Sequence, residues 1–238
     1  MKFLIVSLLF FNINYAQYQF TYDFQIDDNI KTSVLQVDIE NNRSVFKEFI
    51  ATNRKVTSKD KKEEGLVVSV SATDDEYLKE GNLVIHYTDL LKTRFKVNDP
   101  LPEMFWQVTK ENRVIESWTC YKAFVNFRGR VWEVWFTPEV PVSYGPWKFY
   151  NSPGLIVSAK DNENRFSFTL KEIGQYETFE FPTENKKLKQ VDMKTYVENL
   201  DDVLNLNSLN ISSLYTITSG ESQKGLEAIY EWEEEERK

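Results

Sequence analysis

Proline spacing in residues 136–156 constrains the fold of this chain more than any other feature. The segment reads FTPEVPVSYGPWKFYNSPGLI and contains four of the seven prolines, Pro138, Pro141, Pro146 and Pro153. Proline fixes φ and lacks an N–H group, so a regular β ladder cannot run through the segment. Loops of this length are uncommon in compact domains unless they are functional or held by their side chains. We therefore predict a cover packed on a sheet, with Trp147 and Phe149 buried and Tyr144-Gly145 forming a surface turn.

The sequence on both sides of this cover alternates between apolar and polar residues. Residues 17–27 read QYQFTYDFQID, which places every aromatic side chain on one face of a half-buried strand. Similar runs predict strands at 35–39, 66–72, 82–88, 113–127, 131–137, 155–159, 166–173, 174–182 and 226–232. Residues 44–51 fit a strand or a helical turn equally well. The pattern predicts a mainly β fold, an antiparallel meander of about ten strands that forms a curved sheet or a sandwich.

One segment has the period of a helix instead. Between Lys186 and Leu206, apolar residues recur at intervals of three and four with charged residues between them. This spacing predicts one amphipathic helix in the C-terminal half. No linker long enough to separate domains is present, so we expect residues 17–238 to form a single β-rich domain.

The first 16 residues have the layout of a signal peptide. Lys2 precedes an apolar run that ends at Ile13, and Ala16 lies before the expected cleavage site at Gln17. The run is too short to span a bilayer, and no cysteine follows it to carry a lipid anchor. We therefore expect an exported protein of the periplasm or the extracellular space, soluble, not lipid-anchored and not membrane-spanning.

The balance of charge narrows the choice of partners. The chain has 29 basic and 37 acidic residues, and removal of the leader takes away one lysine, so the net charge falls from −8 to −9. An acidic protein is a poor match for nucleic acid or an anionic membrane surface. We therefore expect no nucleic-acid partner.

Residues 121–160 resemble the GLPGLI family, secreted proteins of Bacteroidota-type bacteria whose function is unknown. The resemblance rests on YKAFVNFRGRVWEVWFTPEVP, then GPWKF, then PGLI, where Pro153, Gly154, Leu155 and Ile156 match the end of the family motif. Asn151 and Ser152 stand where the family has Gly-Leu. If the missing glycine requires positive φ, asparagine is the best substitute for it. The resemblance implies a secreted β protein and assigns no activity.

Residues for the usual kinds of catalysis are scarce. His86 and Cys120 are the only histidine and cysteine, and each lies in an apolar strand, so a packed structural role is expected for both. No multi-histidine or thiolate zinc site can form, and no nucleophile elbow or phosphate-binding glycine loop is present. We therefore predict no catalytic residue, no metal and no cofactor.

One cluster flanks the proline-rich cover. Its candidate members, functional or structural, are Arg128, Arg130, Glu133, Glu139, Trp147 and Lys148. Because carboxylates paired with arginine favour the ionised form, we expect a charge network that braces the turn and the cover. The favoured function is a non-catalytic envelope protein that binds an apolar or glycan ligand or accompanies an outer-membrane protein. The alternative is a carboxylate-dependent hydrolase of glycan or peptide that uses Glu133 or Glu139 beside tryptophan.

Overall fold

A computed structural model describes residues 17–49, 75–90, 93–182, 184, 187–200 and 225–235. Four expected features lie outside the described residues: the signal peptide, a solvated loop at the highly charged residues 58–64 (SKDKKEE), the strand at 66–72 and the end of the predicted helix. No helix within the described ranges is long and apolar enough to cross a membrane.

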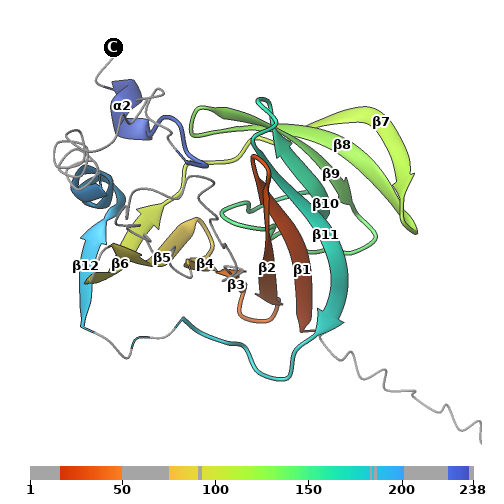
Figure 1. The fold of residues 1–238 in the computed structure, drawn as a ribbon. Coiled ribbons are helices and arrows are strands. Elements are labelled where there is room, and N and C mark those ends of the chain that lie inside the picture. Colours follow the sequence, from red (N-terminus) through yellow and green to blue (C-terminus); the bar gives the residue numbers. More distant parts are fainter. Residues whose placement is uncertain are drawn as a thin grey trace, which may run out of the picture.

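The described residues form twelve strands in one open sheet (Figure 1). The strands are β1 Tyr18–Ile26, β2 Asn29–Asp38, β3 Arg43–Phe49, β4 Glu76–Glu80, β5 Leu83–Leu90, β6 Thr93–Pro100, β7 Gln107–Ile115, β8 Trp118–Phe127, β9 Arg130–Thr137, β10 Leu155–Asp161, β11 Phe166–Gln175 and β12 Leu188–Asp192. Their order across the sheet is β12-β6-β5-β4-β3-β2-β1-β11-β10-β9-β8-β7. The mainly β, largely antiparallel fold class is confirmed, with a curved single sheet as its form.

Hairpin order explains most of this topology. Neighbours in sequence pair antiparallel from β1 through β6 and from β7 through β11. The two series join where β1 pairs with β11, and β12 adds to β6 in parallel. The predicted inward face of β1 is confirmed, because Phe20, Tyr22 and Phe24 are fully buried. Ile39, expected to face inward, is 41% exposed because β2 ends one residue before it.

The main core lies between the concave face of this sheet and the proline-rich cover. Trp147 and Phe149 enter the core from the cover and are 1% and 0% exposed, as predicted. Their rings meet almost perpendicular to each other, with centroids 5.6 Å apart, and Phe149 packs edge-on against Trp132 at 5.1 Å. Edge-to-face contacts of this kind add to the free energy gained by burying the rings. The aromatic residues therefore hold the cover on the sheet.

A buried lysine fixes the middle of the cover. Lys79 donates hydrogen bonds from Nζ to the carbonyl oxygens of Gly145 and Phe149, at 2.6 and 3.0 Å. Burial lowers the pKa of Lys79 well below its ordinary value. Tyr144, beside it, is only 5% exposed and donates from its hydroxyl to the carbonyl oxygen of Asn42 at 2.6 Å. The prediction of a surface turn at Tyr144-Gly145 is therefore wrong, because these bonds draw the turn inward.

Four predicted element boundaries need correction. The run 113–127 is broken by a turn at Glu116, whose φ is +53°, and becomes β7 and β8. The helix begins only at residue 193, after β12, where the side chain of Asp192 accepts the N–H of Thr195 at 2.8 Å. The strand expected at 174–182 is only the end of β11. The strand predicted at 226–232 does not form. Residues Glu231–Glu235 form helix α2, which is capped by a hydrogen bond from the N–H of Tyr230 to the side chain of Glu233.

Candidate ligand-binding groove

The convex face of β7–β11 is built by the side chains that alternation directs away from the main core. Along β9, Trp132 and Val134 point into the core, whereas Glu133 and Trp135 point to the opposite face. Alternation along residues 131–137 predicts this shared face for Glu133 and Trp135, and both line the same surface. A second apolar cluster forms there from Cys120, Trp135 and Val157, with Ile115, Trp118 and Leu170 packed at its edge.

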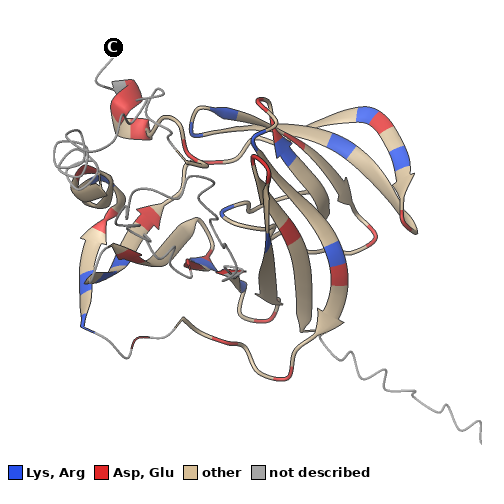
Figure 2. Ribbon diagram, viewed as in Figure 1, with Lys and Arg blue, Asp and Glu red and all other residues tan. Residues whose placement is uncertain are grey.

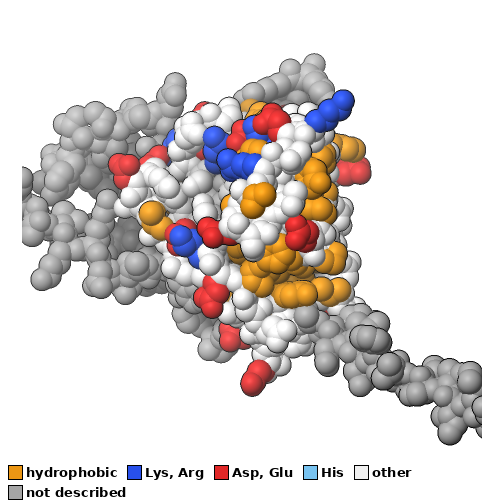
Figure 3. All heavy atoms as spheres, turned by 90° about the vertical axis from the view of Figure 1, so that its right-hand side faces the viewer, with side chains coloured by type: hydrophobic (Ala, Val, Ile, Leu, Met, Phe, Trp, Pro, Cys, Tyr) orange, Lys and Arg blue, Asp and Glu red, His pale blue; other side chains and the backbone are white. Residues whose placement is uncertain are grey.

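This face is hollowed into a groove with a volume of about 780 Å³. Its lining comes from all five strands and the β7–β8 turn, and includes Trp118, Trp135, Glu116, Glu133, Ser158 and Thr169. Figure 3 shows apolar side chains on this side of the molecule, interrupted by charged side chains of both signs. Protein pockets for small ligands have volumes of this order and combine an apolar surface with a few polar groups.

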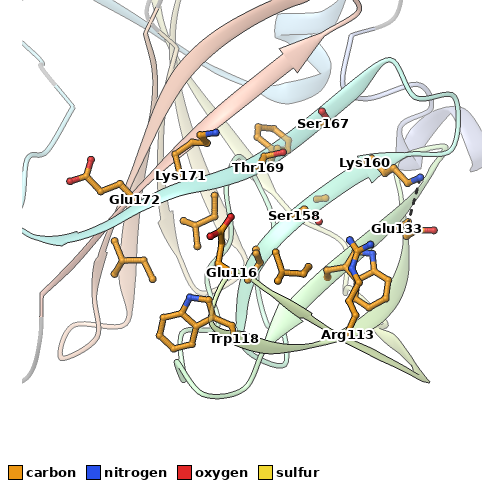
Figure 4. A pocket seen from close by; sticks show the side chains of 17 residues that line it. Arg113, Glu116, Trp118, Glu133, Ser158, Lys160, Ser167, Thr169, Lys171 and Glu172 are labelled. Carbon is orange, nitrogen blue, oxygen red and sulfur yellow. Dashed lines mark ion pairs between the residues drawn. The ribbon is translucent and has the colours of Figure 1, made fainter.

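The open half of the groove combines an indole with hydroxyl and carboxylate groups. In Figure 4, Glu116 extends from the turn between Trp118 and the strand that carries Ser158, and Thr169 lies across the groove from it. Trp118 is only partly buried, so part of its ring is available to a ligand. A flat apolar ring beside hydrogen-bonding groups suits a ligand that has both an apolar face and hydroxyl groups.

The opposite half of the groove is filled by its own contacts. The guanidinium of Arg113 lies 3.9 Å from the centre of the Trp135 ring, so a ligand cannot stack there. Glu133 pairs with Lys122 at 3.6 Å and with Lys160 at 3.7 Å. This half is therefore a braced wall, and Trp118 supplies the available aromatic surface.

The predicted cluster does not form one site. Arg128 and Lys148 do meet, inside the molecule, where both bind Asp99 and Glu227. The shortest contacts to Asp99 are 2.6 Å from Arg128 Nη2 to Asp99 Oδ1 and 2.6 Å from Lys148 Nζ to Asp99 Oδ2. Burial alone would raise the pKa of Asp99, but the charges of Lys148 and Arg128 outweigh it and lower this pKa to about 2. In Figure 2, acidic α2 lies beside the basic β8–β9 turn, and its Glu231 also pairs with Arg128.

The other members lie elsewhere. Arg130 pairs with Asp161 and Glu163, both at 2.9 Å, and Glu139 accepts the N–H of Thr119 at 2.9 Å. The charge network expected among Arg128, Arg130, Glu133 and Glu139 therefore does not form, because neither arginine pairs with either of these two glutamates. Arg130 and Glu133 are three residues apart on one strand, so their side chains point to opposite faces. Asp99 and Glu227 were not predicted as partners of Arg128. They lie 29 and 99 residues from it in the sequence, and no local pattern indicates which distant segment will contact the β8–β9 turn.

His86 has a structural setting, as the sequence suggested. Its Nε2 lies 3.2 Å from Asp75 Oδ1, and its ring stacks on Tyr77 with centroids 4.3 Å apart. Nearby, burial together with the negative charge of Asp75 raises the pKa of Glu48 to about 8. The described residues contain no group of three or more histidine, cysteine, aspartate or glutamate side chains placed to hold a metal ion.

Comparisons with known proteins bear on the fold. No family model matches the sequence, and no curated protein does. Two crystal forms of PNGF-II resemble the structure with a TM-score of 0.53, at 16% and 17% identity, over 77% of this chain and 32% of that chain. An uncharacterised conserved protein from Thermus thermophilus matches with a TM-score of 0.45, at 8% identity, over 74% of this chain and 91% of that one. The match thus spans about a third of PNGF-II, and at this identity it shows a similar fold alone.

Proposed function

We propose that this is an exported, non-catalytic protein of the cell envelope that binds a glycan chain in the groove on the convex face of β7–β11. The observation that carries the proposal is the partly exposed ring of Trp118 beside Glu116 and the hydroxyl-bearing wall of β10 and β11. A sugar ring presents an apolar C–H face, which can pack on the indole ring. It also carries hydroxyl groups, which can form hydrogen bonds with the wall of the groove. A wholly apolar chain would leave these polar groups without partners, which costs free energy.

Export is supported by the sequence and by one detail of the motif region. The leader-like residues 1–16 and the resemblance of residues 121–160 to a secreted family both favour it. The φ of Asn151 is +50°, so asparagine occupies a left-handed position, as expected if it replaces the family's glycine. We propose membership of the GLPGLI family on this basis.

A glycan-binding experiment tests the proposed ligand class. Titration of the protein with soluble envelope and extracellular oligosaccharides should identify a ligand, and Trp118→Ala should weaken its binding roughly tenfold or more, because stacking on the ring is lost. Phe105→Ala is the matched control, since Phe105 is 69% exposed and does not line the groove. Equal binding by wild type and Trp118→Ala would reject this groove as the site.

A hydrolase is the second candidate, because Glu116 and Glu133 both line the groove. A glycosidase needs one carboxyl that gives up a proton and a second carboxylate across the scissile bond. The binding function is favoured because Glu133 is held between Lys122 and Lys160, as structural carboxylates often are. Release of reducing sugar by the wild type, abolished in both Glu116→Gln and Glu133→Gln with folding unchanged, would establish the hydrolase instead.

A further inference from the structure

Strand β7 ends the sheet with an unpaired edge. Within the described residues it has β8 on one side and no strand on the other. Its side chains are almost all exposed, and Val108 and Val114 are 52% and 70% exposed. Figure 1 shows the β7–β8 hairpin projecting from the body of the molecule. The pairing of β7 with β8 is irregular between Val108 and Asn112 and regular again from Asn112 to Ile115. The free edge presents backbone N–H and C=O groups that can pair with another strand.

We propose that β7 pairs antiparallel with β7 of a second copy of this chain, around a two-fold axis at Asn112. In such a pair the residue on the axis faces its own copy, and residues at equal distances on either side face each other. An axis at Lys110, Glu111 or Arg113 would place two like charges directly opposite, which destabilises a sheet. These three positions are therefore excluded by charge.

Charge complementarity selects Asn112 from the positions that remain. With the axis there, Glu111 lies opposite Arg113 of the partner subunit, and the same pair recurs on the other side of the axis. Within one chain Glu111 already pairs with Lys122 at 2.8 Å and Arg113 lies on the Trp135 ring, so the contact across the dimer would be a second interaction for each side chain. Opposite charges facing each other across strands stabilise a sheet. An axis at Val114 would allow only about five residues to pair before the turn at Glu116 interrupts the strand. An axis at Asn112 places the regular residues 113–115 of each chain opposite residues 109–111 of the other and gives two attractive contacts.

This dimer would extend the convex face. The side chains of Arg113 and Ile115 on β7 form one wall of the groove. The two-fold axis would be perpendicular to the sheet, so the convex faces of both copies would lie on the same side. The two grooves would therefore open on the same side of the joined sheet. The inference does not depend on what the groove binds.

Cysteine cross-linking tests the pairing and its register. Opposed Cα atoms in an antiparallel pair are about 4.5–5.5 Å apart, within the reach of a disulfide, so Asn112→Cys should give a covalent dimer under mild oxidation. Val114→Cys is the control, because its two copies would lie about 13 Å apart, four residues out of register. Native Cys120 is fully buried and does not compete.

Sedimentation velocity supplies the second measurement. The wild type should dimerise as its concentration rises, and Glu111→Arg or Arg113→Glu should each weaken dimerisation roughly tenfold. The double variant should restore it, since the charges are then only exchanged. A wild type that stays monomeric, a dimer linked through Val114→Cys and not Asn112→Cys, or charge variants that dimerise normally would each overturn the proposal. Asn112 does not line the groove, so failure here leaves the glycan test unaffected.

Discussion

Asp99 is the residue on which the buried charges of this protein converge. It is fully buried and meets Arg128 and Lys148, which in turn share Glu227. Two buried cations face two buried carboxylates, and the partly exposed Glu231 also pairs with Arg128, so each buried charge loses water but gains charged hydrogen bonds. Removing one partner of such a group leaves a buried charge uncompensated, which is usually far more costly than losing an exposed ion pair.

The first prediction at this scale concerns acid stability. The pKa of Asp99 is lowered from 3.8 to about 2, so its contribution to stability is present above about pH 4 and is lost as the pH falls through about 2. The shift corresponds to about 2 kcal/mol in the free energy of unfolding. Urea unfolding at a series of acidic pH values should show this loss in the wild type.

Asp99→Asn is the control for that experiment. Asparagine does not titrate, so the variant should be less stable at neutral pH and should lack this part of the acid dependence. If wild type and variant lost equal free energy between about pH 4 and pH 2, Asp99 would not be the group responsible.

Some individual positions could be read from the sequence and others could not. Asparagine was named as the best substitute if the family's missing glycine has positive φ, and the φ of Asn151 is +50°. Trp147 was predicted to be buried because a proline-rich cover needs anchors, and it is. Its φ of +53° has no sequence signal, since tryptophan rarely adopts this conformation. The partners of Arg128 come from positions 29 and 99 residues away, beyond any local pattern.

Among the elements, alternation predicted strand ends well where apolar residues fill one face. β1, β9 and β11 satisfy that condition and were predicted with nearly correct ends. β4 was not predicted, because the strand has only five residues and two of them, Glu76 and Lys79, are charged although they are buried. A charged sequence predicts an exposed segment, so no apolar face could be recognised. β12 was assigned to a helix because a strand this short has no distinct period.

The second prediction concerns the end of the proline-rich cover. A Cβ added at Gly154 would lie 2.3 Å from the carbonyl oxygen of Thr137 and 3.0 Å from Cα of Pro138. Backbone atoms cannot move away as a side chain can, so Gly154→Ala should lower the free energy of unfolding by about 3 kcal/mol. This close approach gives a physical reason for glycine in the PGLI sequence.

A matched substitution in β11 controls for the general cost of replacing glycine. The nearest atom to a Cβ at Gly174 is 4.0 Å away, so Gly174→Ala should be close to neutral. Denaturant unfolding of both variants measures the difference. Similar stability for the two would mean that the cover can shift away from Thr137 at little cost.

For the whole molecule, the sequence predicted the fold class and the hairpins β1–β2, β8–β9 and β10–β11, but not strands β4 and β6 or the pairing of distant segments. Each hairpin is a local event, which turn residues and alternation can indicate. The pairing of β1 with β11 and of β6 with β12 joins segments far apart in the chain, and any of several strand edges would satisfy the same apolar pattern. The groove does not depend on this closure, because its lining residues all lie on the hairpin series β7–β11.

The last prediction is that the two ends of the sheet unfold together. Asp99 lies on β6, Arg128 in the β8–β9 turn, and Lys148 in the proline-rich cover, so one buried network ties β6 to the opposite half of the sheet. Native-state hydrogen exchange at rising denaturant should therefore give amides of β6 and β9 the same free energy of opening. In Asp99→Asn the link is weakened, and the β6 amides should exchange at a lower free energy than those of β9. If β6 already opened first in the wild type, the sheet would consist of two independent units and the expectation of a single domain would be wrong.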